Sequence, residues 1–159
     1  MKVEVKEMQF ANSVLLPEIV KLLEEGHTVT LKLKGYSIRP FLEDGRDKAL
    51  LVKAGGNPAV GAPVLAEIAP KHFVLHRIID IQGDKITLMG DGNLSTEHCR
   101  ASDIKADIIG FYRKGRKELD RTDGQKWKTY SKIWMALTPI RRYLLAFYRR
   151  IWLKLFKPI

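Results

Sequence analysis

Cysteine is almost absent from this chain, which contains a single one, Cys99, among its 159 residues. One cysteine cannot form an internal disulfide, and it cannot build a metal site of several thiolates. We interpret Cys99 as a small, partly buried side chain rather than a reactive thiol. Internal repeats and low-complexity runs are also missing, so we expect an ordered globular fold with a real core.

Long apolar runs are missing as well. Arg141-Arg142 and Arg149-Arg150 interrupt the most apolar part of the sequence, so no run reaches the roughly twenty residues that span a bilayer. Residues 1–7 alternate charged and apolar side chains, unlike a secretory signal peptide. We therefore expect a cytoplasmic protein with no signal peptide and no transmembrane helix, and we leave open a peripheral attachment to a membrane.

Acidic residues are missing from one part of the chain only. Residues 124–159 contain nine Lys or Arg and no Asp or Glu, whereas residues 1–123 contain nineteen basic and eighteen acidic side chains. Nearly all of the net charge of +10 therefore belongs to the C-terminal segment. The sequence divides into a nearly neutral domain, residues 1–123, and a basic tail, residues 124–159.

The hydrophobic pattern of the first part predicts a mostly β (α+β) fold. Apolar residues at helical spacing over 13–25 predict one amphipathic helix. Short apolar or alternating runs, separated by glycine and proline, predict strands at 28–34, 48–52, 64–68, 73–79, 85–89 and 106–112. Gly83-Asp84 lies between two of these runs and predicts a hairpin turn.

The basic tail has a different pattern, with apolar and aromatic residues at helical spacing on both sides of Pro139. We expect two amphipathic helical pieces, about 126–137 and 139–156. Basic residues flank the apolar stripe, which suits the headgroup region of an anionic membrane, so residues 126–156 are a candidate membrane-binding segment. Packing on the β domain or on a second copy of the chain explains the stripe equally well. Nucleic acid is disfavoured as a partner because no nucleic-acid-binding module is recognisable.

Three separate segments carry side chains that suggest chemistry. Ser37 lies in the turn after the first predicted strand, His76 lies in an apolar strand, and Asp91 lies in the Gly-Asp-Gly-Asn turn of residues 90–93. A hydroxyl, an imidazole and a carboxylate are the components of an activated serine nucleophile. Taken one at a time, each also has a structural explanation, as a turn serine, a buried histidine and a turn aspartate.

Taken together, the three segments resemble the serine peptidase clan that contains signal peptidases and the LexA-like SOS repressors. Ser37, with Pro40 three residues later, matches the nucleophile motif, and His76-Arg77-Ile78 resembles the His-Arg-Val/Ile motif of archaeal and endoplasmic-reticulum signal peptidases. The run MGDGN, residues 89–93, resembles the Lys-Gly-Asp-Asn-Asn motif that follows in that family. The resemblance covers residues 28 to 112 and implies a signal-peptidase-like β catalytic core.

The resemblance implies a serine endopeptidase that cleaves a peptide or protein through an acyl-enzyme on Ser37. His76 would be the general base and then the general acid, and Asp91 would be the acid that orders the site. The second acid of the eukaryotic-type motif falls on Glu97. No metal and no organic cofactor is implied.

The resemblance places two further positions, Gly35 and Ile38, next to the substrate. Gly35 stands where many signal peptidases carry a serine that supplements the oxyanion hole, and Ile38 replaces the usual methionine after the nucleophile. Lys71 and Lys85 are the nearest candidates for a lysine base in place of the histidine. A non-catalytic module that keeps the peptide-binding fold and docks through its basic tail is the alternative function.

Overall fold

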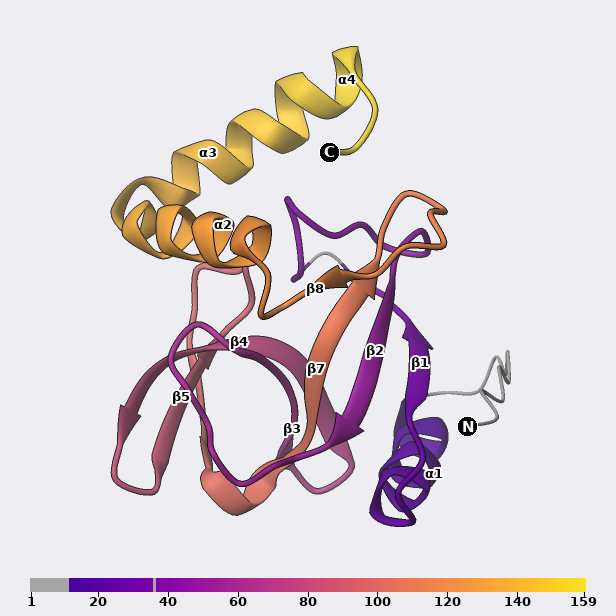
Figure 1. Ribbon diagram of the computed structural model, residues 1–159. Coiled ribbons are helices and arrows are strands. Elements are labelled where there is room, and N and C mark those ends of the chain that lie inside the picture. Colours follow the sequence, from indigo (N-terminus) through magenta and orange to yellow (C-terminus); the bar gives the residue numbers. More distant parts are fainter. Residues whose placement is uncertain (1–11, 36) are drawn as a thin grey trace.

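The computed structural model describes residues 12–35 and 37–159 and forms a predominantly antiparallel sheet with a few helices (Figure 1). The α+β class expected from the sequence is therefore confirmed. The expectation that there is no signal peptide depends on residues 1–7, which lie outside the described residues. Tyr36 lies outside them as well. Within those residues, no helix has the length and the apolar character needed to cross a membrane.

The described residues form one eight-stranded sheet in the order β1-β2-β7-β3-β4-β5-β6, with β8 paired to β7. The strands are β1 (Val29–Lys32), β2 (Lys48–Lys53), β3 (Pro63–Ala69), β4 (His72–Gln82), β5 (Lys85–Met89), β6 (Glu97–Arg100), β7 (Ile104–Tyr112) and β8 (Asp120–Arg121). Every neighbouring pair is antiparallel, and β7 inserts between β2 and β3. The sheet curls strongly, so that its two halves face different sides of the molecule (Figure 1).

All six strands expected from the sequence are present. The hairpin turn is also confirmed, because Gln82 pairs with Lys85 across Gly83, which has a φ of 61°. Such a positive φ favours glycine, which has no Cβ to clash with the backbone. The short strands β6 and β8 were not predicted, since four polar-rich residues and two charged residues carry no alternating apolar pattern.

The helices lie at opposite ends of the molecule (Figure 1). At one end is α1 (Asn12–Glu24). At the other are α2 (Gln125–Ala136), a 3₁₀ turn (Thr138–Ile140), α3 (Arg141–Phe147), a π-helical turn (Tyr148–Trp152) and α4 (Leu153–Leu155). We call the continuous run of residues 141–155 the helical arm. A further 3₁₀ turn, Ala101–Asp103, precedes β7.

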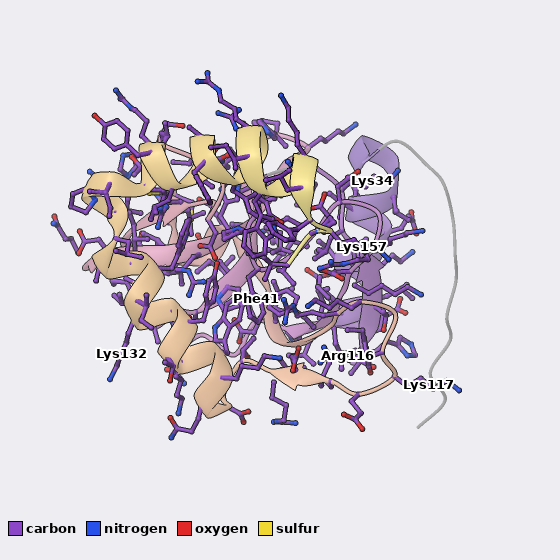
Figure 2. The ribbon with its side chains drawn as sticks, turned by 90° about the horizontal axis from the view of Figure 1, so that it is seen from above. Lys34, Phe41, Arg116, Lys117, Lys132 and Lys157 are labelled. Carbon is purple, nitrogen blue, oxygen red and sulfur yellow. The ribbon has the colours of Figure 1, made fainter. Side chains whose placement is uncertain are left out.

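The basic tail shares the main hydrophobic core of the protein. Leu23 of α1, Leu51 of β2 and Phe111 of β7 belong to one buried cluster, and Trp127 of α2 belongs to the same cluster. Phe41 packs edge-on against Trp127, with ring centroids 5.3 Å apart, and lies near the centre of the view in Figure 2. Intramolecular packing, one of the three options for the tail, therefore accounts for the inner face of α2.

Candidate functional site

His76 reaches the 90–93 turn because of the strand register. In the antiparallel β4–β5 pair Arg77 lies opposite Met89, so the residue after Met89 lies beside His76. His76, Arg77 and Ile78 are all buried, which breaks the alternation expected of a half-exposed strand. The alternation is lost because α2 covers the side of β4 that would otherwise face solvent, where Arg77 contacts Ser131 of that helix.

Glu97 holds the other side of the His76 ring. Its Oε2 lies 2.7 Å from His76 Nδ1, a close ion-pair contact, and no hydrogen bond of regular geometry reaches either of these two buried atoms among the described residues. A carboxylate beside Nδ1 favours the tautomer that carries its proton on that nitrogen. Nε2 is then left as the proton acceptor of the ring, which is the state a general base requires.

Burial lowers the pKa of His76 below its usual 6.5, although the charge and the hydrogen bond of Glu97 act in the opposite direction. The neutral imidazole is therefore the dominant form at pH 7. A histidine that is neutral and oriented can accept a proton from a hydroxyl near physiological pH.

The Ser37 turn is tied to the 90–93 turn by the backbone. The N–H of Gly92 donates to the carbonyl oxygen of Ser37 at 2.8 Å, and the N–H of Asn93 closes its own turn on the carbonyl of Gly90 at 3.0 Å. The two turns are more than fifty positions apart in sequence, so this contact exists only in the folded protein. It brings the candidate nucleophile into the neighbourhood of His76.

Gly90 lies between the Ser37 backbone, the Asn93 side chain and the His76 ring. A Cβ atom placed on Gly90 would lie 2.6 Å from the Ser37 carbonyl oxygen, 2.8 Å from Asn93 Nδ2 and 3.0 Å from His76 Nε2. The first two distances are shorter than real Cβ contacts, and the third is shorter than most of them, so any larger residue at position 90 would displace at least one of these neighbours. The edge of the His76 ring that carries Nε2 therefore faces Ser37 and Asn93.

The hydrogen bond from Ser37 Oγ to His76 Nε2 that a catalytic dyad would require is not formed in this structure. Ser37 is half-buried, and within the described part of the chain its Oγ makes no hydrogen bond. Catalytic hydrogen bonds are often long or poorly aligned without substrate and tighten when it binds. The structure brings the backbone of Ser37 close to His76, and no hydrogen bond joins Ser37 Oγ to His76 Nε2 among the described residues.

The two predicted substrate-facing positions have different surroundings. The N–H of Gly35 donates to Asp44 Oδ1 at 2.6 Å, so this donor is already engaged and does not face a substrate oxygen. Ile38 is buried and lines a cavity of about 20 Å³ together with His76 and Phe111. A cavity of that size holds about one water molecule or one small apolar group beside the imidazole.

Asp91, the predicted ordering acid, has a different partner from the one expected. Its carboxylate receives two hydrogen bonds from Arg77, at 2.8 and 2.7 Å, and one from the hydroxyl of Tyr130 at 2.7 Å. Trp134 Nε1 donates to the Asp91 carbonyl at 3.0 Å. The acid in direct contact with His76 is Glu97, and Asp91 instead fixes the 90–93 turn from the side of α2.

Asp91 and Arg77 are a deeply buried ion pair. Burial disfavours the charged guanidinium, but the hydrogen bonds and the charge of Asp91 outweigh it, and the pKa of Arg77 is raised. Burial, followed by the nearby Asp91 charge, raises the pKa of Tyr130 well above 10, so its hydroxyl remains a donor. The Arg77 guanidinium also lies 4.7 Å from the centre of the Trp127 ring, which adds a cation–π contact.

Several residues at this site were not found from the sequence as functional candidates. Asn93 was seen only as part of a turn, and Tyr130 and Trp134 only as members of an apolar helical stripe. The spacing of four residues between Tyr130 and Trp134 shows that they share one helix face, but no sequence signal identifies Asp91 as their partner. Arg141 was noted only as part of the pair that interrupts the apolar run, but it is buried and lies 5.1 Å from the centre of the Trp134 ring.

Other candidate chemistry is limited. No group of three or more His, Cys, Asp or Glu side chains suited to a metal ion occurs within residues 12–35 and 37–159. Cys99 is buried, and burial raises its pKa to about 11, so the thiol is protonated at pH 7. The expectation that it is a buried, inert side chain is confirmed. Lys71 and Lys85 are both exposed.

No protein-family model and no curated protein matches the chain.

The titration of His76 can be measured directly. We expect the ring to titrate below pH 6.5, and Glu97→Gln to lower its pKa further, because the variant removes the charge that favours the imidazolium. Imidazole nitrogen shifts followed by NMR against pH test both statements. Since the folded protein binds this proton more weakly than the unfolded chain, the contribution of His76 to stability is present above pH 6.5 and is lost as the pH falls through its folded pKa.

Glu25→Gln is the control for this titration, because Glu25 lies beside His27, at 3.9 Å, and not beside His76. The His76 signal should be the same in that variant as in the wild type. A His76 pKa above 6.5, or one that rises in Glu97→Gln, would contradict the arrangement of the two side chains.

Proposed function

We propose that this chain is a serine endopeptidase that hydrolyses a peptide bond with Ser37 as nucleophile, His76 as general base and Glu97 as the group that orients His76. The observation that carries the proposal is the orientation of the His76 ring. Glu97 Oε2 lies 2.7 Å from His76 Nδ1. His76 Nε2 lies on the same side of Gly90 as the Ser37 turn. A nucleophile, a base and an orienting acid in this order form the triad arrangement known from several unrelated folds.

The proposed reaction has two steps. Ser37 Oγ attacks the carbonyl carbon of the scissile peptide while His76 Nε2 takes the hydroxyl proton, and the same nitrogen gives this proton to the leaving amine. Water then attacks the acyl-enzyme while His76 accepts a proton from it, and His76 returns this proton to Ser37 Oγ as the bond from Oγ to the acyl carbon breaks and the new carboxyl group leaves. The side-chain amide of Asn93 faces the same space and would donate to the oxyanion.

A serine-directed fluorophosphonate probe tests the nucleophile without knowledge of the substrate. The wild type should be labelled at Ser37, as located by mass spectrometry, and labelling should fall by at least 1,000-fold in Ser37→Ala and in His76→Ala. Turnover of fluorescence-quenched peptide libraries at pH 7 to 8 should fall in parallel. Ser102→Ala is the matched control, since Ser102 is exposed on the 3₁₀ turn before β7.

The same experiment separates the alternative function, a peptide-binding module without catalysis. Peptide binding that is equal in the wild type and Ser37→Ala, with no labelling of Ser37 and no cleavage, would favour the module and end the proposal of an enzyme. Labelling at another serine would also overturn the role of Ser37.

A further inference from the structure

The helical arm, residues 141–155, carries an apolar surface that the rest of the protein does not cover. Large hydrophobic side chains are exposed along it and just after it, with exposed fractions of 72% for Tyr143, 52% for Phe147, 69% for Leu155 and 58% for Phe156. Ile140, Ile151 and Ile159 are exposed as well. Most of the exposed large hydrophobic residues in the described part of the chain belong to this one segment, so they form a patch rather than scattered single residues.

The spacing of these residues places them on one side of the helix. Tyr143, Phe147 and Ile151 are four residues apart and therefore share a face, while Leu145 and Tyr148 are buried on the other side against the protein. Figure 2 views the molecule from above, from the side on which α2 and the helical arm lie, and shows the arm along one edge of this face. The arm thus has an inner apolar face that packs against the protein and an outer apolar face that is exposed to solvent.

Cations surround the outer face. Arg149, Arg150 and Lys154 are exposed, and none of them pairs with a carboxylate among the described residues. The whole segment of residues 124–159 contains nine Lys or Arg and no Asp or Glu. A surface that combines exposed aromatic and aliphatic groups with unpaired positive charges is complementary to an anionic surface with an apolar interior.

We propose that the helical arm docks this protein on the surface of an anionic lipid bilayer. The side chains of Tyr143, Phe147 and Ile151 would enter the boundary between headgroups and acyl chains, and the cations would contact the lipid phosphates. Each cation near such a surface raises partitioning about fivefold at low ionic strength. The arm would lie in the plane of the membrane.

Docking in this way places the candidate site close to the lipid. The arm lies over the segment that follows Ser37, since Arg46 Nη1 donates to the carbonyl of Pro158 at 3.2 Å and the Arg39 guanidinium lies 5.9 Å from the centre of the Tyr148 ring. About one helix diameter, roughly 10 Å, then separates that segment from the headgroups. The docking itself does not depend on the proposed peptidase activity.

Vesicle co-sedimentation of the full chain tests the docking. The wild type should pellet with vesicles containing phosphatidylglycerol and not with vesicles of phosphatidylcholine alone, and 0.5 M salt should release it. The apolar triple variant Tyr143→Gln, Phe147→Gln and Ile151→Gln should bind at least tenfold more weakly. The charge triple variant Arg149→Gln, Arg150→Gln and Lys154→Gln should lose on the order of 100-fold.

Two matched triple variants serve as controls, with folding checked by circular dichroism. Val60→Gln, Leu94→Gln and Ile133→Gln remove exposed apolar side chains elsewhere, and Lys21→Gln, Lys32→Gln and Lys53→Gln remove exposed charges elsewhere. Both should bind within twofold of the wild type.

Wild-type protein that stays in the supernatant with anionic vesicles, or arm variants that pellet as well as the controls, would overturn the proposal. A dimer in analytical ultracentrifugation that the apolar triple variant disperses, without vesicle binding, would assign the face to a second copy of the chain instead. Ser37→Ala should bind vesicles as the wild type does, so failure of the peptidase proposal is distinguishable from failure of this one.

Discussion

Replacing Gly90 with alanine should reduce labelling of Ser37 and peptide turnover by on the order of 100-fold or more. The new methyl group would meet the Ser37 carbonyl at 2.6 Å and His76 Nε2 at 3.0 Å, so at least one of the two must move. A displacement of about 1 Å between reacting groups costs on the order of 100-fold in rate. The backbone of Gly90 does not have a positive φ, so the effect would come from the crowding and not from strain.

Gly55→Ala is the matched control for this variant. A Cβ at Gly55 would approach only Asp107 Oδ2, at 3.4 Å, which is an ordinary contact, and its backbone also lies outside the positive-φ region. We expect that variant to keep its labelling rate and thermal stability. Gly90→Ala should in addition shift the His76 ring signals in NMR spectra, which is a readout independent of any enzymatic activity. Unchanged His76 signals and unchanged labelling would show that the two turns do not meet as described.

The sequence was sufficient to predict most elements of this fold, with β6 and β8 as exceptions, but not the contacts between the elements. The strand containing His76 and the helix near residues 126–137 each follow from a local hydrophobic pattern. The contact of His76 with Glu97 depends on the register of three strands, and Leu88 lies opposite Ile78 on one side and Glu97 on the other. A local pattern contains no information about register at that range, so the ordering role was given to Asp91 although Glu97 is the acid that contacts His76.

The structural role of the tail could not be predicted for the same reason. Its charge and its apolar stripe suggested an outer surface, and the stripe alone did not separate intramolecular packing from docking. The structure divides these roles between two helices. Trp127, Tyr130 and Trp134 of α2 pack inward on the core and on the 90–93 turn, while the arm exposes its outer face. Because α2 completes the wall behind Asp91, experiments on the site require the full chain.

Removing one partner of the buried Arg77–Asp91 pair should destabilise the protein by about 3–5 kcal/mol, because the remaining charge has no water to solvate it. The two side chains are 2% and 9% exposed. Arg77→Met would leave the Asp91 carboxylate with the hydroxyl of Tyr130 as its main remaining side-chain donor. For a protein of this size, the expected fall in melting temperature in a thermal denaturation experiment is about 10 °C.

The matched control is Asp123→Ala, which breaks the exposed pair of Arg121 and Asp123, whose side chains are 58% and 65% exposed. That variant should melt at the wild-type temperature, since exposed pairs contribute little. The double variant Arg77→Met with Asp91→Leu should recover much of the lost stability, because it removes both charges together. Its Ser37 labelling should stay low, since the 90–93 turn would no longer be held against α2. Equal loss in the single and double variants would mean that the packing of these side chains, and not the unpaired charge, determines their contribution.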